Sequence, residues 1–500
     1  MLSFKIKKHE ILLGISAVVL YLVTRLYNIM SLPLFTDEAI YTRWSQIARF
    51  DPNWRFISLT DGKQPLFVWI DMMFMRVISD PLLSGRIVSV FAGFLTMIGL
   101  YFLGKELFGK RVGIITVFLY ILFPFSLVYD RMALYDSLVV TGAVWSLFFE
   151  ILLVKYKRLD LSLILGMILG ASVLTKTSGF LFIYLLPFSL LLFNFKSKNR
   201  KDLLIKWGIL AAISVGFAYL YYSVQRLSPY LHIVDEKNAI FVYPFSEWII
   251  HPLRFFWGNL KGMWDWVLTY TTWPILILIL SSFFIKIKFT REKLILFSWF
   301  IFPFIALALF GNILYPRFVL FMTMPLLVLA AFSMNEILKR LKRNYYKVFV
   351  VGVFIGALVY LDYSIINNFA RARIPYLDSE QYVNGWPAGG GTNEIIEYLR
   401  KESKKGKIYV ASLGTFGSLP TYAVEIYLGD NKNIGKGGIY PVPSEMPKDL
   451  LEKAKTMPVY IFVSNQEEFE KQITTWPIKE LLKYQKGIGK SYAYLYEVKI

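Results

Sequence analysis

The stretch Pro33-Leu34-Phe35-Thr36-Asp37-Glu38-Ala39-Ile40-Tyr41 follows the first long apolar segment of the chain. It places two adjacent carboxylates, Asp37 and Glu38, where that segment ends. Ionisable side chains at membrane depth are costly, and they are therefore candidates for function. A structural interpretation is also open, since Thr36 or Asp37 can cap a helix over residues 38–50. Capping and catalysis are compatible, so the carboxylate pair is the first candidate site.

The composition of the chain predicts a protein with several membrane-spanning helices. Of its 500 residues, 56% are hydrophobic, and its mean hydropathy is +0.49, a value that soluble domains rarely reach. Aromatic residues make up 17% of the chain, which fits belts of aromatic side chains at the membrane interfaces. The absence of cysteine excludes disulfides and thiolate metal sites. The three histidines argue against a His-rich metal centre.

A helix needs about 20 consecutive apolar residues to cross a bilayer, and some spans are shorter and tilted. Eleven segments qualify: 11–29, 82–103, 112–128, 136–154, 160–175, 178–193, 203–223, 272–287, 293–311, 316–334 and 346–366. Two further segments, 37–50 and 65–79, are predicted to be interfacial helices that lie on the membrane.

The basic residues predict the orientation of these spans. Lysine and arginine cluster before the first span and in every second connection after it, within residues 5–8, 105–111, 155–158, 196–201, 286–293 and 339–343. We expect this side to be cytoplasmic, with the N-terminus on it, in a multi-pass protein of the cell membrane. Topology thus explains much of the net charge of +20, so nucleic acid is not an expected partner.

The opposite side receives the loops 30–81, 129–135, 176–177 and 224–271 and the chain after residue 367. The charged candidates all fall at this external face, which predicts one polar cavity there: Asp37, Glu38, Lys63, Arg131, Asp136, Lys176 and Arg317. The loop 224–271 is rich in tryptophan. Its tryptophans either anchor an amphipathic segment at the interface or form a lid that stacks on a sugar.

The cations also have structural explanations. Lys63 lies in Asp61-Gly62-Lys63-Gln64-Pro65, which suits a turn stopped by proline. Arg131 and Asp136 can pair within an ordinary loop. Arg317 follows Tyr315 at the start of a span and can extend toward the interface.

A shared role for these cations is the functional alternative. Lys176 lies between two spans on the side that otherwise lacks positive clusters. Cations at membrane depth suit a lipid phosphate, which arginine can bind through two hydrogen bonds. Nucleotide sugars are made in the cytoplasm, so an external enzyme needs a donor that has crossed the membrane, such as a polyprenyl-phosphate-linked sugar. Cations would stabilise the departing phosphate, and Asp37 would deprotonate the acceptor hydroxyl.

These motifs resemble those of the GT-C glycosyltransferase superfamily, and in particular the dolichyl-phosphate-mannose protein mannosyltransferases and the lipid A aminoarabinose transferases (glycosyltransferase families 39 and 83). The resemblance covers roughly residues 10–340. It rests on the order and spacing of Asp37-Glu38-Ala39-Ile40-Tyr41, Gly62-Lys63-Gln64-Pro65-Leu66, Arg131-Met132-Ala133-Leu134-Tyr135-Asp136, Leu174-Thr175-Lys176, and Tyr315-Pro316-Arg317 with Pro325.

The resemblance implies a GT-C fold and an inverting transfer from a polyprenyl-phosphate sugar. It makes Asp37, with Glu38 beside it, the catalytic carboxylate, and Lys63 a ligand of the donor phosphate. We add Arg131, Lys176 and Arg317 as phosphate ligands, and Asp136 and Tyr315 as supporting residues. The aminoarabinose transferases carry a metal-binding glutamate where Gly62 stands here, so the resemblance leaves a divalent metal open and gives zinc little support.

The predicted architecture is a polytopic α-helical membrane domain over residues 1–370, with about 11 transmembrane helices, and a small external α/β domain over 371–500. In the latter, Gly389-Gly390-Gly391 lacks the Lys-Ser/Thr of a P-loop. Thr392 is expected to cap a helix that reaches Lys404. The remaining predicted elements are strands at Ile408–Leu413 and Val459–Val463, a helix at Glu467–Thr474 and an edge strand at Tyr492–Val498.

Three functions compete. The first is a glycosyltransferase that moves mannose or a similar sugar to a protein, lipid or glycan acceptor, with protein Ser/Thr and cell-envelope glycan as the options. The second is a lipid transporter or flippase, for which internal repeats and helices interrupted at mid-membrane are expected. No repeat is evident, and the charges cluster at one face. The third, a membrane-anchored scaffold, leaves the external cations unexplained.

Overall fold

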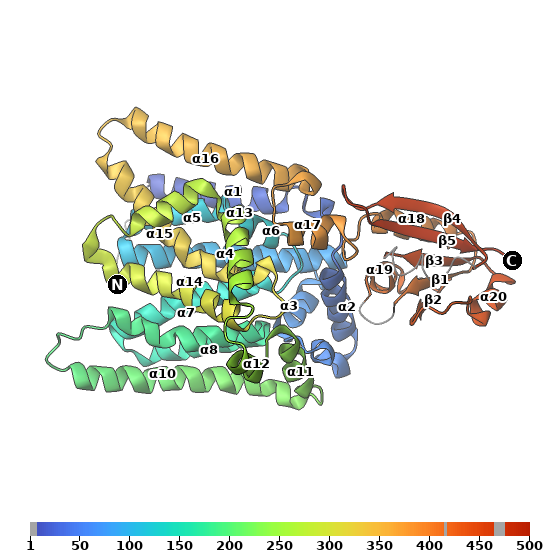
Figure 1. The fold of residues 1–500 in the computed structure, drawn as a ribbon, viewed down its shortest axis with the longest axis horizontal. Helices are drawn as coiled ribbons and strands as arrows, with labels where there is room; N and C mark the ends of the chain where they lie inside the picture. Colours follow the sequence, from blue (N-terminus) through green and yellow to red (C-terminus); the bar gives the residue numbers. More distant parts are fainter. Residues whose placement is uncertain (1–7, 415–417, 465–475) are drawn as a thin grey trace. The chain divides into compact units, whose positions relative to one another are not determined.

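The computed structural model describes residues 8–414, 418–464 and 476–500, and it is mainly helical (Figure 1). The chain forms two compact units. The first comprises Met1–Tyr27, Asn53–Ile70 and Arg86–Ile366, and the second comprises Asn28–Pro52, Asp71–Gly85 and Asn367–Ile500. The second unit therefore combines the C-terminal residues with two segments of the first predicted external loop.

The helices before the C-terminal sheet follow the predicted apolar segments closely. Their bounds are α1 Lys8–Leu26, α2 Thr36–Phe50, α3 Leu66–Phe74, α4 Pro81–Phe108, α5 Lys110–Ile121, α6 Pro124–Tyr129, α7 Asp136–Tyr156, α8 Leu159–Thr175, α9 Phe180–Leu185, α10 Arg200–Ser223, α11 His232–Phe241, α12 Phe245–Ile250, α13 Phe256–Ser282, α14 Thr290–Phe310, α15 Leu320–Arg340 and α16 Asn344–Asn367. Among the described residues, eight helices are long and apolar enough to cross a membrane. The predicted polytopic helical fold is therefore confirmed.

The difference between eight long helices and eleven predicted spans has local causes. The predicted span 112–128 is divided into α5 and α6, and α6 begins at Pro124, since proline favours the first turn of a helix. The predicted span 178–193 consists of the short α9 and a 3₁₀ segment that contains Pro187. The third predicted span without a long helix, 160–175, is present as α8, which is shorter than the eight long helices.

The segment 224–271 is largely helical rather than an open loop. It contains α11, α12 and the first part of α13. The predicted span start at residue 272 instead marks a kink inside α13, where Thr272 has φ 64° and Pro274 follows. A proline inside a helix removes a backbone hydrogen bond, which accounts for a kink at this place.

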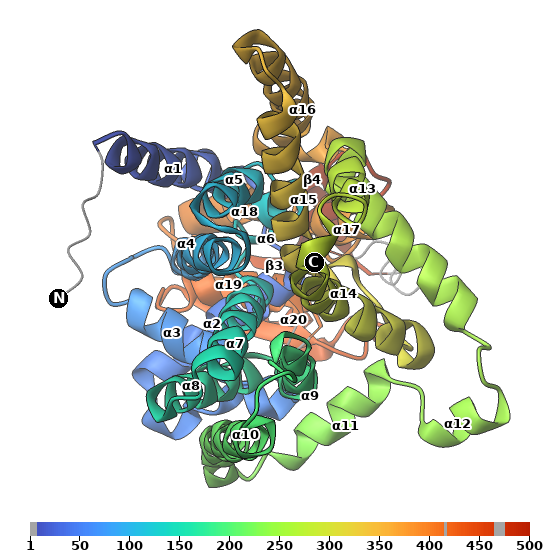
Figure 2. The same cartoon turned by 90° about the vertical axis from the view of Figure 1, so that its left-hand side faces the viewer.

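Burial separates inner from outer helices in the first unit. In the most apolar stretch of α15, 94% of the residues are buried inside the protein. The corresponding share is 17% in the first span and in α16, and 22% in the span that contains α10. Figure 2 looks along the helices and shows α15 among its neighbours, with α16 and α10 at the periphery. The outer helices are at least as apolar as α15, so it is burial by other helices that sets α15 apart. The turn Pro316–Phe318, which carries Arg317, directly precedes this inner helix.

The C-terminal part of the second unit is built on a five-stranded sheet in the order β2-β1-β3-β5-β4. The β1 strand pairs in parallel with β2 and β3, and β5 pairs antiparallel with β3 and β4. The bounds are α17 Tyr376–Ser379, α18 Thr392–Glu402, β1 Ile408–Leu413, α19 Leu419–Leu428, β2 Ile434–Ile439, α20 Lys448–Ala454, β3 Val459–Val463, β4 Ile478–Gln485 and β5 Tyr492–Val498. The predicted α/β domain is thus confirmed.

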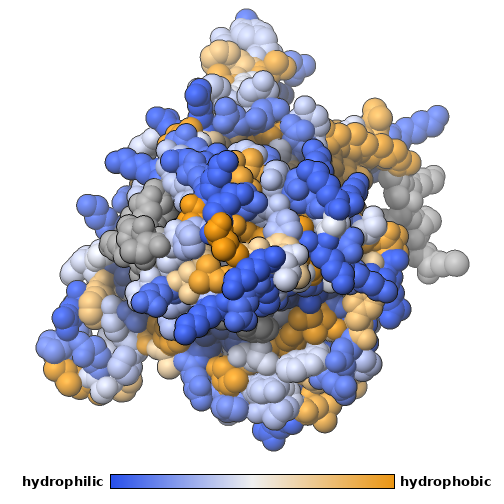
Figure 3. All heavy atoms as spheres, turned by 90° about the vertical axis from the view of Figure 1, so that its right-hand side faces the viewer, coloured by the Kyte–Doolittle hydropathy of each residue, from blue (hydrophilic) through white to orange (hydrophobic). Residues whose placement is uncertain are grey.

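Two details of this domain differ from the sequence prediction. The strand Tyr492–Val498 lies between β3 and β4, so it is not at the edge of the sheet. Thr392 is the first residue of α18, and Gly391, with φ +82°, is the capping residue. The predicted helix Glu467–Thr474 lies outside the described residues. In the space-filling view of Figure 3, hydrophilic residues cover much of the visible face, with smaller hydrophobic patches between them.

Candidate functional site

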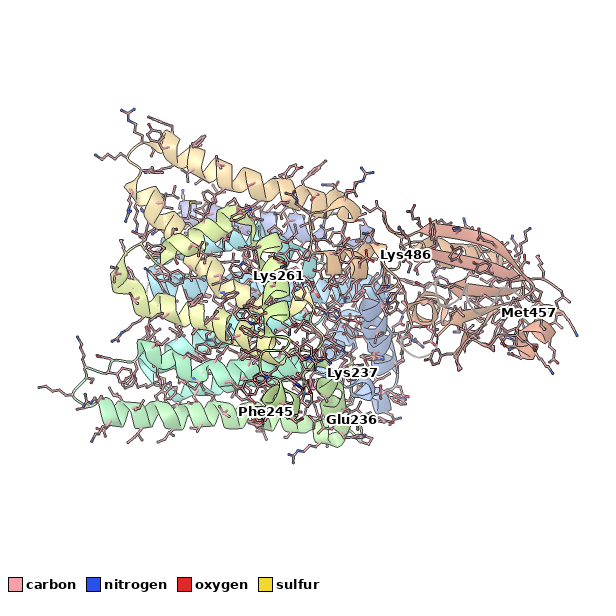
Figure 4. All side chains as sticks on the ribbon, in the orientation of Figure 1. Glu236, Lys237, Phe245, Lys261, Met457 and Lys486 are labelled. Carbon is pink, nitrogen blue, oxygen red and sulfur yellow. The ribbon has the colours of Figure 1, made fainter. Side chains whose placement is uncertain are left out.

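A left-handed turn fixes the position of Lys63. The 3₁₀ helix Ile57–Asp61 ends at Gly62, whose φ of +65° is a conformation that favours glycine. The Asp61 carboxylate accepts a hydrogen bond from Lys237 on α11 at 2.7 Å, and Figure 4 labels Lys237 on that helix. A Cβ atom at Gly62 would lie 2.4 Å from Cβ of Lys237. The turn therefore requires glycine both for its backbone and for its contact with α11.

Three of the predicted phosphate ligands converge on one group of aromatic rings. We call Phe241, Tyr315 and Phe318 the aromatic cluster; the rings of Phe241 and Phe318 lie 6.1 Å apart, and those of Tyr315 and Phe318 lie 5.7 Å apart.

Each cation of this group lies over one ring of the aromatic cluster. Lys63 Nζ is 5.5 Å from the ring centre of Phe241, Lys176 Nζ is 4.6 Å from that of Phe318, and Arg317 Cζ is 5.1 Å from that of Tyr315. Cations within about 6 Å of a ring face are attracted to it. The structure thus brings together Lys63, Lys176 and Arg317, which come from distant parts of the sequence.

The supporting residue Asp136 belongs to the same neighbourhood. It is buried, and its Oδ1 accepts a hydrogen bond from Lys176 Nζ at 2.8 Å. This ion pair joins the start of α7 to the end of α8. The sequence allows an ion pair between Arg131 and Asp136. In the structure, Asp136 pairs with Lys176 instead. We infer that Asp136 orients the lysine against the ring of Phe318.

Arg131 has different surroundings. Its Nη2 donates to the carbonyl of Tyr27 at 3.0 Å, and its side chain is buried. Burial, together with the nearby cations Arg25 and Arg86, lowers the pKa of its guanidinium to about 10. The contacts described here place Arg131 in an arginine-rich group rather than over the aromatic cluster, so its role as a phosphate ligand stays a prediction.

The carboxylate pair lies in the second unit, at the start of α2. Glu38 is fully buried, and its Oε2 accepts a hydrogen bond from the backbone N–H of Phe35 at 3.1 Å. It therefore closes the first turn of α2, which begins at Thr36. Asp37 is half-buried. The proximity of Asp37 to the cations stays a prediction.

Sequence reasoning missed a buried ion pair in the first unit. Arg25, inside the first span, and Asp130 have Nε and Oδ2 3.3 Å apart, and both side chains are almost completely buried. Tyr120 and Ser137 donate hydrogen bonds to the same carboxylate at 2.9 and 3.0 Å. The available signal was Arg25 itself, since an arginine within an apolar span requires a partner.

The residues around Gly62 do not fit a resident metal ion. Lys237 occupies the space that a side chain at position 62 would need, and Asp61, the neighbouring carboxylate, is paired with Lys237. In the described ranges, no three His, Cys, Asp or Glu side chains gather to hold a metal.

Comparison with known proteins supports the architecture. The family described as dolichyl-phosphate-mannose-protein mannosyltransferase matches residues 62–222, a range that contains Lys63, Arg131 and Lys176. No curated protein matches the chain by sequence.

Solved structures show the same fold over nearly the whole chain. ArnT from Cupriavidus metallidurans in the apo state is 12% identical with a TM-score of 0.56, and 97% of each chain is covered. The same protein bound to undecaprenyl phosphate gives 13% and 0.55 over the same shares. AglB from Archaeoglobus fulgidus, an archaeal oligosaccharyltransferase in complex with an inhibitory peptide and a dolichol-phosphate, is 13% identical with a TM-score of 0.56 over 92% of this chain and 70% of that one. The resemblance predicted from the motifs is confirmed: this chain has the fold of the GT-C glycosyltransferase superfamily.

Proposed function

We propose that the protein is an inverting glycosyltransferase that moves a sugar from a polyprenyl-phosphate donor to an acceptor hydroxyl at the outer face of the cell membrane. The observation that carries the proposal is the convergence of Lys63, Lys176 and Arg317 on the aromatic cluster. The GT-C fold adds support, because two solved relatives hold undecaprenyl phosphate and dolichol-phosphate.

The charges of this group suit the leaving group of the reaction. A polyprenyl-phosphate sugar is a phosphodiester, and it gains negative charge on phosphate as the bond to the sugar breaks. The group contains three cations and one carboxylate, Asp136, which is paired with Lys176. Positive groups that are already in position stabilise the charge that develops in the transition state. The apolar rings around them lower the local polarity and strengthen that interaction.

In the proposed reaction, Asp37 accepts the proton of the acceptor hydroxyl. The acceptor oxygen forms a bond to the anomeric carbon from the side opposite the phosphate. The bond between that carbon and the phosphate oxygen breaks, and its electron pair leaves with polyprenyl phosphate. One displacement inverts the anomeric configuration. Glu38, which is buried and bound to the Phe35 amide, supports the first turn of α2 beside the base.

The proposed reaction has a sugar and an acceptor that remain to be chosen by experiment. We propose mannose or a related hexose or pentose as the sugar, and protein Ser/Thr as the first acceptor to test. A lipid or cell-envelope glycan is the alternative acceptor, since the fold is shared with ArnT as well as with the mannosyltransferase family.

The test is transfer by the purified full chain in lipid nanodiscs. Polyprenyl-phosphate mannose is supplied with a Ser/Thr peptide or a glycolipid, and released polyprenyl phosphate is measured by mass spectrometry. We expect release that depends on the acceptor, and a product of inverted anomeric configuration by NMR. Asp37→Asn should lower kcat by about 10²- to 10⁴-fold, the range of general base catalysis. Full activity of this variant would remove Asp37 from the mechanism.

The cations need a matched control, which Lys261 supplies. Lys261 is an exposed lysine of the same unit on α13, and Figure 4 labels it. Lys63→Ala and Arg317→Ala should raise the KM for the donor more than that for the acceptor, while Lys261→Ala should leave both near wild type. A larger effect on the acceptor would contradict the phosphate role, and absence of transfer from a panel of polyprenyl-phosphate hexoses and pentoses would refute the proposed function.

A further inference from the structure

The stretch that carries Asp37 is bound to a segment 351 positions later in the chain. Within the second unit, both the backbone N–H and the Oγ1 of Thr36 donate to the carbonyl of Pro387, at 3.1 and 2.9 Å. Phe35 forms an antiparallel bridge with Ala388. The ring of Phe35 also meets that of Tyr382 edge-on, with centres 4.9 Å apart. These contacts fix the backbone immediately before Asp37.

The partner segment is in turn anchored by a buried lysine of the C-terminal domain. Lys486, labelled in Figure 4, directly follows β4. Its Nζ donates to the carbonyl of Trp386 at 2.8 Å, and to the carbonyl and Oγ of Ser464 at 2.7 and 2.8 Å. Its side chain is completely buried. A buried ammonium group is tolerated when its donors are satisfied, and here they tie residue 386 to the end of β3.

The rest of α2 is held by a helix of the same domain. Arg43 Nε donates to Glu425 Oε2 on α19 at 2.7 Å, and Gln46 Nε2 donates to the carbonyl of Ile426 at 3.3 Å. The helix that starts at Thr36 is therefore attached at its first residue, by Pro387, and farther along its length, by α19.

We propose that the C-terminal domain positions the catalytic carboxylate, with Lys486 and the carbonyl of Pro387 acting through Thr36 on Asp37. This inference rests on the proposed function, and it assigns a positioning role to residues of a domain in which the sequence shows no catalytic group. Lys486 orders Trp386, the adjacent Pro387 carbonyl binds Thr36, and Thr36 sets the direction in which Asp37 leaves the first turn of α2.

The experiment compares Lys486→Met with Lys479→Met, an exposed lysine on β4, in the full chain. Hydrogen exchange of the peptide that covers residues 34–40 should be at least about tenfold faster in Lys486→Met, since the local opening energy falls when the anchor is lost. In the transfer assay, kcat should fall by about 10- to 100-fold, the loss expected for a catalytic group misplaced by about 1 Å, while the KM for the donor stays within about twofold. Lys479→Met should match wild type in both.

A second variant covers the case in which Lys486→Met does not fold. Thr36→Val removes only the side-chain bond to Pro387, so it should lower kcat with an unchanged donor KM, and Thr36→Ser should restore it. Unchanged exchange at residues 34–40 in folded Lys486→Met, or wild-type kcat in Thr36→Val, would overturn the proposal. If the wild-type protein transfers no sugar, the proposed function fails, whereas the exchange measurement still decides whether the domain orders the Asp37 stretch.

Discussion

The buried pair of Arg25 and Asp130 gives the sharpest prediction about stability. Replacing Arg25 by Met keeps most of the apolar stem and removes the guanidinium. Asp130, whose side chain is 3% exposed, would then keep Tyr120 and Ser137 as donors but lose its countercharge. Loss of one partner from a buried ion pair costs about 3–5 kcal/mol.

Further groups add to this cost. The Arg25 guanidinium also donates to Ser126 Oγ at 3.0 Å and to the carbonyls of Tyr120 and Ile121. Each acceptor left unsatisfied in a buried place costs about 1–3 kcal/mol, although water or a small shift can recover part of it. We therefore expect Arg25→Met to lie at the upper end of the range.

The double variant Arg25→Met, Asp130→Asn separates charge from packing. It removes both charges, so its loss in the free energy of unfolding should be smaller than the sum of the two single losses by about 2 kcal/mol or more, since contacting residues couple by about 0.5–3 kcal/mol. The free energies come from SDS-induced unfolding in mixed micelles, followed by tryptophan fluorescence. Additivity within about 0.5 kcal/mol would show that the pair does not act as an ion pair and would refute this reasoning.

Three further predictions follow from local geometry. Gly62→Ala should raise the donor KM in the transfer assay as Lys63→Ala does, because the new Cβ collides with α11; a wild-type KM would contradict the role of the turn. Lys176→Met should destabilise the protein in SDS unfolding by about 3–5 kcal/mol through the buried Asp136, and adding Asp136→Asn should restore part of the loss; a double variant no more stable than the single would count against the ion pair. Burial raises the pKa of Asp71 to about 7 from the usual 3.8, so the folded state holds a proton that the unfolded state releases between these values. Wild-type stability should thus fall by up to about 4 kcal/mol as pH rises from 4 to 7, and the melting temperature of Asp71→Asn should gain on wild type over that interval; a constant difference would contradict it.

The membrane domain was predictable because its elements are governed by local apolarity. Most predicted spans coincide with helices, and errors arise where proline interrupts an apolar run, as at Pro124 and Pro274. Apolar composition predicts that a segment is buried in lipid or protein, but it does not predict where a helix bends. The sequence could predict only that Lys63, Lys176 and Arg317 share one side of the membrane. It could not predict their convergence, because the three cations lie in three distant segments and the rings that they contact lie in two.

The C-terminal domain was less predictable because its strands carry weaker patterns. The strand β2, Ile434–Ile439, is half glycine, and glycine is depleted in strands. It is nonetheless ordered there, since it pairs in parallel with β1 along its whole length. Tyr492–Val498 alternates as an edge strand does, yet neighbours on both sides cover it. The register and the order of the strands depend on pairing with segments that are distant in the sequence, so the residue pattern of one strand does not predict them.

The sequence does not indicate that the stretch around Asp37 belongs to the same compact unit as the C-terminal residues. Thr36 is adjacent to Asp37, but the carbonyl that binds Thr36 belongs to Pro387. A contact of this sequence separation closes a long loop, and the other contacts of the second unit must offset the entropy that this closure costs. The order of the stretch that carries Asp37 therefore depends on contacts with the C-terminal residues, and substitutions around Lys486 should affect turnover although they lie in a different part of the sequence. Simple loss of folded protein would also lower the apparent kcat at an unchanged donor KM, because it lowers only the active fraction. Faster exchange at residues 34–40 in the folded molecules is therefore the measurement that distinguishes this coupling from loss of folded protein.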